Sequence, residues 1–233
     1  MSAEKRIILI TGGSQGLGKE LARKLKEDIA NTVVVLSNEK VSLEHTTEEL
    51  KCHSYLCDIT DVASVQKVVK EVEEKFGHID VLINDAGVWV GGDLDDNDYS
   101  DIARVMLVNS VGTINMTKAV VRVMKKQRSG KIINIGSIDG IETKEDRSIY
   151  SASKWAITGF TKALGKDLEK YNVGVVGIYP GLIDTGLFAN SGASRDMTYA
   201  MKPEQVSKIV EFILGFDDIV FDQVVFRNLH FKV

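Results

Sequence analysis

The chain has 233 residues, 44% of them hydrophobic and 27% charged, and its formal net charge is −4. These values are ordinary for a globular protein with a large core, which excludes a disordered chain and a scaffold that depends on disulfides or metals. The slight excess of acidic residues disfavours nucleic acid as a partner, because no basic surface dominates.

Short β-branched segments alternate with longer amphipathic ones along the chain. The strand-like segments cover residues 6–11, 32–37, 53–58, 79–84, 131–137 and 173–180. Helical patterns separate most of them, as in residues 62–76, where valines recur with a helical period. Strands that are apolar on both faces and separated by helices predict an α/β protein with a parallel sheet covered on both sides. Because no linker-like stretch interrupts the pattern, we expect one domain over residues 1–233.

Two segments depart from this alternation. Residues 101–128 form one long helical pattern that contains only Gly112 as an interruption. Residues 181–201 have no clear period and many small side chains, which is typical of a lid, a binding loop or a disordered segment, and we expect a substrate loop there. The acidic segment 91–101 is expected to be a solvated loop that leads into a helix N-terminus, where carboxylates are favourable. A helix-like segment at 203–216 precedes a strand-like C-terminus.

The sequence carries no recognisable targeting, membrane or metal signal. The N-terminus lacks the apolar stretch of a secretory signal, and no segment is long enough to span a bilayer. Cys52 and Cys57 form no metal-binding pattern with the four histidines, and we interpret them as buried or half-buried thiols in a reducing compartment. We therefore expect a cytoplasmic protein without a bound metal.

A glycine-rich turn lies directly after the first strand-like segment and directly before a helical one. In TGGSQGLG, Gly12, Gly16 and Gly18 allow a tight turn and a close approach of the backbone to a ligand. The helix that follows offers unpaired N–H groups and the positive end of its dipole to a pyrophosphate. This context predicts a dinucleotide site, and without a following Gly-Lys-Ser/Thr the turn is not a mononucleotide P-loop.

The segment SIYSASK places Tyr150 and Lys154 four residues apart, on one face of a helix. A free tyrosine has a pKa of about 10, and an ammonium within about 4–6 Å favours the phenolate and lowers that pKa. The spacing indicates either a tyrosine tuned as a general acid and base or an ordinary surface pair. Ser137 ends a strand-like segment thirteen residues earlier, at the sheet edge where ligands bind in open α/β folds.

Along nearly its whole length the sequence resembles the short-chain dehydrogenase/reductase family. The resemblance rests on TGGSQGLG with its G-x-x-x-G-x-G spacing, CDIT at 57–60, NDAG at 84–87, VNSVG at 108–112, IGS at 135–137, YSASK at 150–154 and YPGLIDT at 179–185. It implies a small single-domain member with a Rossmann-type, doubly wound parallel β-sheet. It also implies hydride transfer between a nicotinamide and a carbonyl or alcohol carbon.

The resemblance implies a catalytic set of Asn109, Ser137, Tyr150 and Lys154. Ser137 would hold the substrate oxygen against Tyr150, the general acid and base, and Lys154 would also hold the nicotinamide ribose. Asn109 would bind a water that relays protons between Lys154 and solvent. Taken singly, the same residues also fit structural roles: a solvated helix position for Asn109, a strand-end cap for Ser137 and a surface pair for Tyr150 and Lys154.

The resemblance also implies cofactor contacts along several segments. They are Gly12, Ser14, Gln15, Gly16, Leu17, Gly18, Ser37, Asn38, Asp58, Ile59, Asn84, Ala86, Gly87, Tyr150, Lys154, Pro180, Gly181, Ile183 and Thr185. Ser37 stands where an acidic residue would bind the ribose 2′-hydroxyl and repel a 2′-phosphate. We therefore expect NADP(H), with Lys19 or Lys40 as sources of positive charge. NAD(H) stays the alternative, because Gln15 and Asn38 stand where relatives that prefer NADP often have basic residues.

The substrate end is less legible in the sequence. Asp85 replaces the second asparagine of the family's Asn-Asn-Ala-Gly segment, and we expect from it a local structural change without a catalytic role. Trp89, Asp139 and Phe188 lie beside motif positions that face the cleft in this family, and each also fits simple packing or an exposed loop position. A small carbonyl or alcohol is the expected substrate.

Two other functions fit parts of the sequence. A protein that senses NAD(P) without turnover would keep the glycine turn but is expected to lose Tyr150 or Lys154, and both are present. An epimerase or dehydratase on this scaffold usually needs a larger substrate domain and a G-x-x-G-x-x-G turn, and the sequence shows neither. By resemblance, the protein forms a homodimer or homotetramer through the helices at 101–128 and 150–171.

Overall fold

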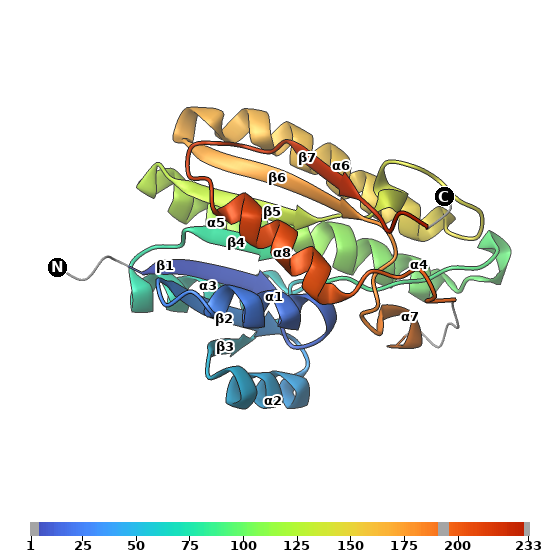
Figure 1. The fold of residues 1–233 in the computed structure, drawn as a ribbon, viewed down its shortest axis with the longest axis horizontal. Coiled ribbons are helices and arrows are strands. Elements are labelled where there is room, and N and C mark those ends of the chain that lie inside the picture. Colours follow the sequence, from blue (N-terminus) through green and yellow to red (C-terminus); the bar gives the residue numbers. More distant parts are fainter. Residues whose placement is uncertain (1–4, 191–195, 231–233) are drawn as a thin grey trace.

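The computed structural model describes residues 5–190 and 196–230, which form a seven-stranded sheet between two layers of helices (Figure 1). The strands are β1 Arg6–Thr11, β2 Asn31–Ser37, β3 His53–Leu56, β4 Val81–Asn84, β5 Gly130–Ile135, β6 Val173–Pro180 and β7 Gln223–Phe226. The helices are α1 Gly16–Lys26, α2 Lys40–Leu50, α3 Val62–Phe76, α4 Tyr99–Met106, α5 Thr113–Gln127, α6 Ser148–Leu168, α7 Leu187–Asn190 and α8 Pro203–Leu214. Short helical turns are η1 Leu94–Asp96, η2 Leu107–Gly112, η3 Ile138–Gly140 and η4 Glu169–Tyr171.

The strands lie in the order β3-β2-β1-β4-β5-β6-β7, and their pairings are parallel. The order reverses between β1 and β4, which pair from Ile8 with Val81 to Thr11 with Asn84. The doubly wound α/β fold predicted from the sequence is therefore confirmed. At such a reversal a crevice opens beyond the carboxyl ends of the strands. In Figure 1 these ends point toward α4 and α7.

The strands are apolar on both faces because each face packs against helices. In β1, Ile8 and Ile10 belong to the core under α1 and α8, whereas Ile7 and Leu9 belong to the core under α3 and α5. Alternate side chains of a strand point to opposite faces, which explains why the whole segment is apolar. The buried stripe of α3 is the predicted valine pattern and consists of Val65, Val68, Val69 and Val72.

The long helical pattern at 101–128 is divided into α4 and α5 by η2, a π-helical turn that carries Asn109. Gly112 ends this turn, and a Cβ there would lie 2.7 Å from the Ile59 side chain, so glycine permits a close approach to the segment after β3. The π-helical turn shifts the helical spacing of the apolar residues only slightly. The sequence therefore predicts a single helix over this whole segment. Such π-bulges are rare in proteins, and those that occur are often found at functional sites.

The irregular loop expected at 181–201 is more regular than predicted. Leu187–Asn190 form α7, and Ile183 pairs with Met201 in an isolated parallel bridge, while residues 191–195 lie outside the described part of the chain. The Asp184 N–H donates to the Met201 carbonyl over 2.9 Å, and the Met201 N–H donates to the Leu182 carbonyl over 2.8 Å. These backbone bonds join residues far apart in the chain, so no local pattern in the sequence predicts them.

Two smaller expectations are confirmed. Residues 91–98 form a largely exposed segment that leads into α4, with Asp101 in the first turn of that helix. Cys57 is buried and Cys52 half-buried. Across residues 5–190 and 196–230, no helix combines the length and the apolar character that crossing a membrane requires.

Candidate active site

A cavity of about 620 Å³ opens at the carboxyl end of the sheet, where the strand order reverses. Its wall includes most of the predicted cofactor residues: Gly12, Ser14, Gln15, Gly16, Leu17, Ser37, Asn38, Asp58, Ile59, Ala86, Gly87, Pro180, Gly181, Ile183 and Thr185. Ser137, Tyr150, Lys154, Trp89, Asp139 and Phe188 line the same cavity. The predicted residues Gly18, Asn84 and Asn109 lie behind its wall.

The glycine turn needs its glycines for close backbone approach. Gly12 has a φ of +68°, and a Cβ there would lie 2.8 Å from the Ala86 Cα. A Cβ at Gly18 would lie 2.5 Å from the Gly12 carbonyl oxygen. The turn is thus packed against the segment after β4, and the N–H groups of the first turn of α1 stay at the cavity end of the helix. This cradle fits a pyrophosphate held by backbone amides.

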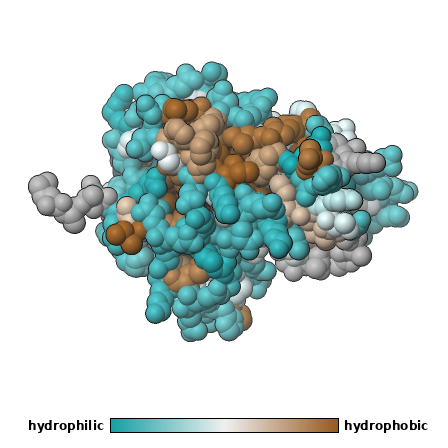
Figure 2. All heavy atoms as spheres, in the orientation of Figure 1, coloured by the Kyte–Doolittle hydropathy of each residue, from teal (hydrophilic) through white to brown (hydrophobic). Residues whose placement is uncertain are grey.

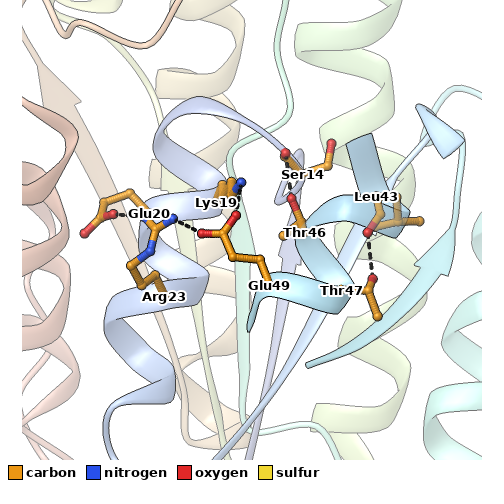
Figure 3. A network of polar contacts seen from close by, with 8 residues as sticks. All are labelled: Ser14, Lys19, Glu20, Arg23, Leu43, Thr46, Thr47 and Glu49. Carbon is orange, nitrogen blue, oxygen red and sulfur yellow. Dashed lines mark hydrogen bonds and ion pairs between the residues drawn. The ribbon is translucent and has the colours of Figure 1, made fainter. Parts of the chain in front are cut away.

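Helix α2 supports the glycine turn from outside the cavity (Figure 3). The Thr46 hydroxyl donates to the Ser14 carbonyl over 2.9 Å. Glu49 bridges Lys19 and Arg23 on α1, with a nitrogen–oxygen distance of 2.6 Å in each pair. Lys19 is therefore paired away from the cavity, and it does not line the wall.

The end of β2 is built from hydroxyl groups. Ser14 Oγ donates to Ser37 Oγ over 2.8 Å, and the Glu39 N–H donates to the same Ser37 oxygen over 3.1 Å. Lys40, the second lysine considered for a 2′-phosphate, lies 3.8 Å from Glu44 and outside the wall. Glu39 does line the wall and was not predicted, because the family pattern places the residue that discriminates between the cofactors at position 37.

Tyr150 and Lys154 are buried at the cavity wall, with exposed fractions of 7% and 6%. Their interpretation as a surface pair is therefore wrong. The Lys154 ammonium lies 5.7 Å from the centre of the Tyr150 ring and donates to the Ile135 carbonyl over 3.1 Å. The hydrogen bond to Ile135 anchors the lysine to the end of β5, two residues before Ser137.

The pKa of Tyr150 differs from the sequence-based expectation. Burial raises the pKa of its phenol above the usual value, Asp139 adds to the rise, and a hydrogen bond with Ser137 opposes it. Burial also lowers the pKa of Lys154 to about 8, against the opposing effect of Asp85 and Asp139. For Tyr150 the loss of hydration thus outweighs the hydrogen bond with Ser137 and the positive charge of Arg147, because a buried phenolate is costly.

Asn109 is fully engaged within the protein. Its side-chain oxygen accepts from the Val88 N–H over 2.8 Å, and its amide donates to the Val88 carbonyl over 2.9 Å and to Ser153 Oγ over 3.1 Å. Ser153 Oγ in turn donates to the Tyr150 carbonyl over 2.7 Å. Asn109 is 1% exposed, so its interpretation as a solvated helix position is wrong. It ties the loop after β4 to α6, and the water relay stays a prediction.

The segment after β4 contains one core residue and one unusual carboxyl group. Asn84 is buried, and its amide donates to Thr117 and Asn134, which places it inside the core. The Asp85 carboxyl lies against α1, where its Oδ2 would be 2.8 Å from a Cβ at Gly18, and it accepts from the Gly18 N–H. Burial raises the pKa of Asp85 to about 7, although Lys154 opposes the rise.

The substrate end of the cavity is partly aromatic and partly charged. Trp89 and Phe188 meet edge to face, with ring centres 5.1 Å apart. On the same wall Asp139 pairs with Arg147, and Arg104 on α4 also lines the cavity. Neither arginine was predicted. The signal for Arg147 is the highly charged segment that directly precedes Tyr150 in the sequence.

Comparison with known proteins places these features in a family. The family model for short chain dehydrogenases matches residues 6–196. A 3-ketodihydrosphingosine reductase of Bacteroides thetaiotaomicron is 36% identical over 193 residues, covering 82% of this chain and 69% of that protein. Carbonyl reductase family member 4 of Xenopus laevis is 34% identical over 217 residues, covering 90% and 91%.

Solved structures give the same result. An actinorhodin polyketide ketoreductase variant with NADPH is 26% identical, with a TM-score of 0.89 and 98% of each chain covered. An NAD+-bound xylitol dehydrogenase is 27% identical, with a TM-score of 0.86 and coverage of 97% of this chain and 100% of that one. With the glycine turn, the Ser137, Tyr150 and Lys154 wall and a family match over most of its length, the chain belongs to the short-chain dehydrogenase family.

Proposed function

We propose that the protein is a single-domain NAD(P)(H)-dependent oxidoreductase that uses Tyr150 as the general acid and base on a carbonyl or alcohol substrate. The observation that carries this proposal is the common cavity that joins the glycine turn to Ser137, Tyr150 and Lys154. A bound nicotinamide would supply or accept the hydride. The names of the related reductases support the class of reaction and leave this chain's own substrate open.

The side chains divide the proton chemistry between them. In reduction, Ser137 holds the carbonyl oxygen by a hydrogen bond, and the Tyr150 phenol gives its proton to that oxygen as negative charge develops. In oxidation the phenolate takes the proton back. Lys154, fixed to the Ile135 carbonyl, places a positive charge 5.7 Å from the centre of the phenol ring and favours the phenolate once a substrate oxygen shares its proton.

For the cofactor we propose a preference for NADP(H). Ser37 leaves the end of β2 without the carboxylate that would repel a 2′-phosphate, and the Ser14 and Ser37 hydroxyls and Asn38 offer neutral hydrogen-bonding groups there. Glu39 works against this preference. Melting temperatures measured with NADPH and with NADH at equal concentration test the proposal, because a ligand that binds the folded state raises the melting temperature. An equal or larger rise with NADH would contradict it.

The reaction is tested by comparing wild type and Tyr150→Phe with a panel of carbonyl substrates. The rate of each reaction is measured as the oxidation of NADPH. We expect a loss of about 10²–10⁴-fold in kcat, because the proton donor is removed and the ring is kept. Tyr171→Phe is the matched control: it removes a phenol at η4, outside the cavity wall, and should leave the rate unchanged. Full activity of Tyr150→Phe would refute the assigned role.

A protein that binds NAD(P) without turnover is the second candidate, and the observation that favours it is the burial of Tyr150, which raises the pKa of its phenol. It predicts a melting-temperature rise with dinucleotide and no dinucleotide oxidation with any carbonyl in the panel. Turnover that Tyr150→Phe abolishes would exclude it.

We also propose self-association into a homodimer or homotetramer. One exposed apolar face, here called the helical face, comprises Leu107, Val111, Ile114 and Trp155, on η2, α5 and α6. Figure 2 shows hydrophobic residues gathered over β7 and the segment before it, where Val220 and Val225 are about half exposed. Two separate apolar faces favour the tetramer. The cytoplasmic location stays a prediction from the sequence.

A further inference from the structure

The substrate end of the cavity contains a buried ion pair between Asp139 and Arg147. Arg147 Nη1 donates to both carboxylate oxygens of Asp139, over 3.0 and 3.1 Å. Their side chains are 9% and 13% exposed, which makes this the most buried of the ion pairs found among the described residues. Both residues line the cavity together with Ser137 and Tyr150.

The pair connects the two segments that carry the reacting hydroxyl groups. Asp139 lies in η3, directly after Ser137, and its N–H donates to Ser137 Oγ over 3.1 Å. Arg147 is the residue that precedes α6, and its carbonyl accepts from the Ser151 N–H over 2.7 Å, next to Tyr150. A change on either side of the pair therefore bears on the distance between Ser137 and the phenol.

Simple bracing does not account for the pair. Thr158 Oγ1 on α6 already donates to the Gly140 carbonyl over 2.9 Å and so holds η3 against the helix. A buried ion pair must also recover the cost of removing two charges from water, and apolar residues of similar size often stabilise a fold as well or better. A charged pair at this place is better explained by what it does for the neighbouring phenol.

The two charges act on that phenol in opposite directions. Asp139 raises the pKa of Tyr150, whereas Arg147 lowers it. Lys154 on the same helix, Asp85 after β4 and Arg104 on α4 also line this cavity, and Lys144 interacts electrostatically with both members of the pair. Of these groups, Asp85 also raises the pKa of Tyr150. With both members present the net charge added beside the phenol is zero, and removal of one member exposes the other.

We propose that Asp139 and Arg147 are a pair of positioning residues that hold Ser137 and Tyr150 against one substrate oxygen and keep the charge around the phenol balanced. The proposal rests on the proposed function of Tyr150. Neither residue transfers a proton. Their removal should affect kcat more than KM, because the pair orders groups that act in the transition state.

The test compares Asp139→Asn, Arg147→Gln and the double variant in the direction of alcohol oxidation, which requires the phenolate. The quantity measured is the pH at which kcat/KM reaches half of its plateau value. Asp139→Asn should move this midpoint to lower pH and Arg147→Gln to higher pH, each by about half a unit to one unit. The double variant should return it near the wild-type value while kcat stays about tenfold lower.

Three controls keep the outcomes separate. Arg147→Lys retains the positive charge and should keep the wild-type midpoint. This variant tests the role of the charge even if one of the neutral variants fails to fold. Arg6→Gln removes a half-buried arginine at the start of β1 and should leave the midpoint unchanged. The rise in melting temperature with dinucleotide should persist in every variant, which verifies the fold without relying on turnover.

The results separate two failures. An unmoved midpoint in both single variants, or a shift in the same direction, would overturn the proposal while an inactive Tyr150→Phe upholds the proposed function. An active Tyr150→Phe would refute the proposed function itself, whatever the ion-pair variants do.

Discussion

Asp85 places an ionisable carboxyl group in a buried site, where its charged form is unfavourable. Its carboxyl group is held against the first turn of α1, where burial raises its pKa from 3.8 to about 7. The folded state therefore binds a proton that the unfolded state releases at about pH 4. Stability from this group is complete in acid and is lost as the pH rises to about 7.

Asp85→Asn should remove this pH dependence, because the amide keeps an acceptor for the Gly18 N–H and cannot ionise. One pKa unit corresponds to about 1.4 kcal/mol, so the variant should be more stable than wild type by up to about 4 kcal/mol near pH 8. At pH 4 the two proteins should be nearly equal. Urea unfolding at both pH values measures the difference.

The window for this comparison ends at about pH 8. Burial lowers the pKa of Lys154 to about 8, so the folded state releases that proton early and the lysine contributes with the opposite sign at higher pH. Asp95→Asn, in the exposed loop before α4, is the matched control and should not change the pH dependence. If Asp85→Asn and Asp95→Asn behave alike, the buried carboxyl group has no such role.

Glu39 gives a residue-scale test of cofactor choice. Its side chain lies at the cavity end where the 2′-position of an adenosine ribose is proposed to bind, so its charge opposes a 2′-phosphate. Glu39→Gln should tighten NADPH binding by about 3–10-fold and leave NADH binding nearly unchanged. Titration by fluorescence with each dinucleotide measures both. Glu44→Gln, on the helix α2 that directly follows Glu39 but outside the cavity wall, is the control.

At this scale the sequence predicts identities better than environments. Tyr150 and Lys154 were predicted from their spacing of one helical turn, and Ser137 from its place at the end of a strand and from the family resemblance. The burial that raises the pKa of Tyr150 depends on packing between β5, α6 and the loop after β4, which no short motif encodes. Arg147 was missed for the same reason: its partner Asp139 lies eight residues away across a turn.

At the scale of elements, the glycines of the turn and of α6 should respond to substitution in opposite ways. Gly12→Ala forces a residue with a φ of +68° to carry a Cβ 2.8 Å from the Ala86 backbone. We expect a loss of about 2–4 kcal/mol in unfolding free energy and a weaker response of the melting temperature to dinucleotide.

Gly159→Ala is the matched control within a helix. Gly159 is exposed in α6, and a Cβ there would meet no atom within 4 Å among the described residues. Alanine should therefore stabilise the protein by about 0.5–1 kcal/mol through its higher helix propensity. Thermal and urea unfolding measure both variants. Equal effects of the two substitutions would show that the glycine turn is not constrained as its geometry indicates.

The elements themselves were predictable where their signals are local. β1 and β6 match the expected segments, and the valine stripe of α3 is buried as predicted. The π-helical turn at Asn109 and the bridge between Ile183 and Met201 were not predicted. Both lie where distant segments of the chain meet: Gly112 against Ile59 in one case, and backbone bonds across the substrate loop in the other.

At the scale of the whole molecule, the helical face predicts how the chain associates. Leu107, Val111, Ile114 and Trp155 are each between 37% and 46% exposed. Exposed apolar side chains that gather on one face are a mark of a protein–protein interface. Because this face comes from η2, α5 and α6, an interface there would also support the helix that carries Tyr150.

Val111→Asp should reduce association, because it places a carboxylate where an interface would exclude water. We expect a shift of the molar mass toward the monomer by light scattering on a sizing column. The melting temperature should be lower than that of the wild type and should no longer depend on protein concentration. Val41→Asp is the control, since Val41 is 65% exposed on α2, away from this face. An unchanged molar mass in Val111→Asp would move the proposed interface to β7 and the segment before it, where Val225→Asp becomes the decisive variant.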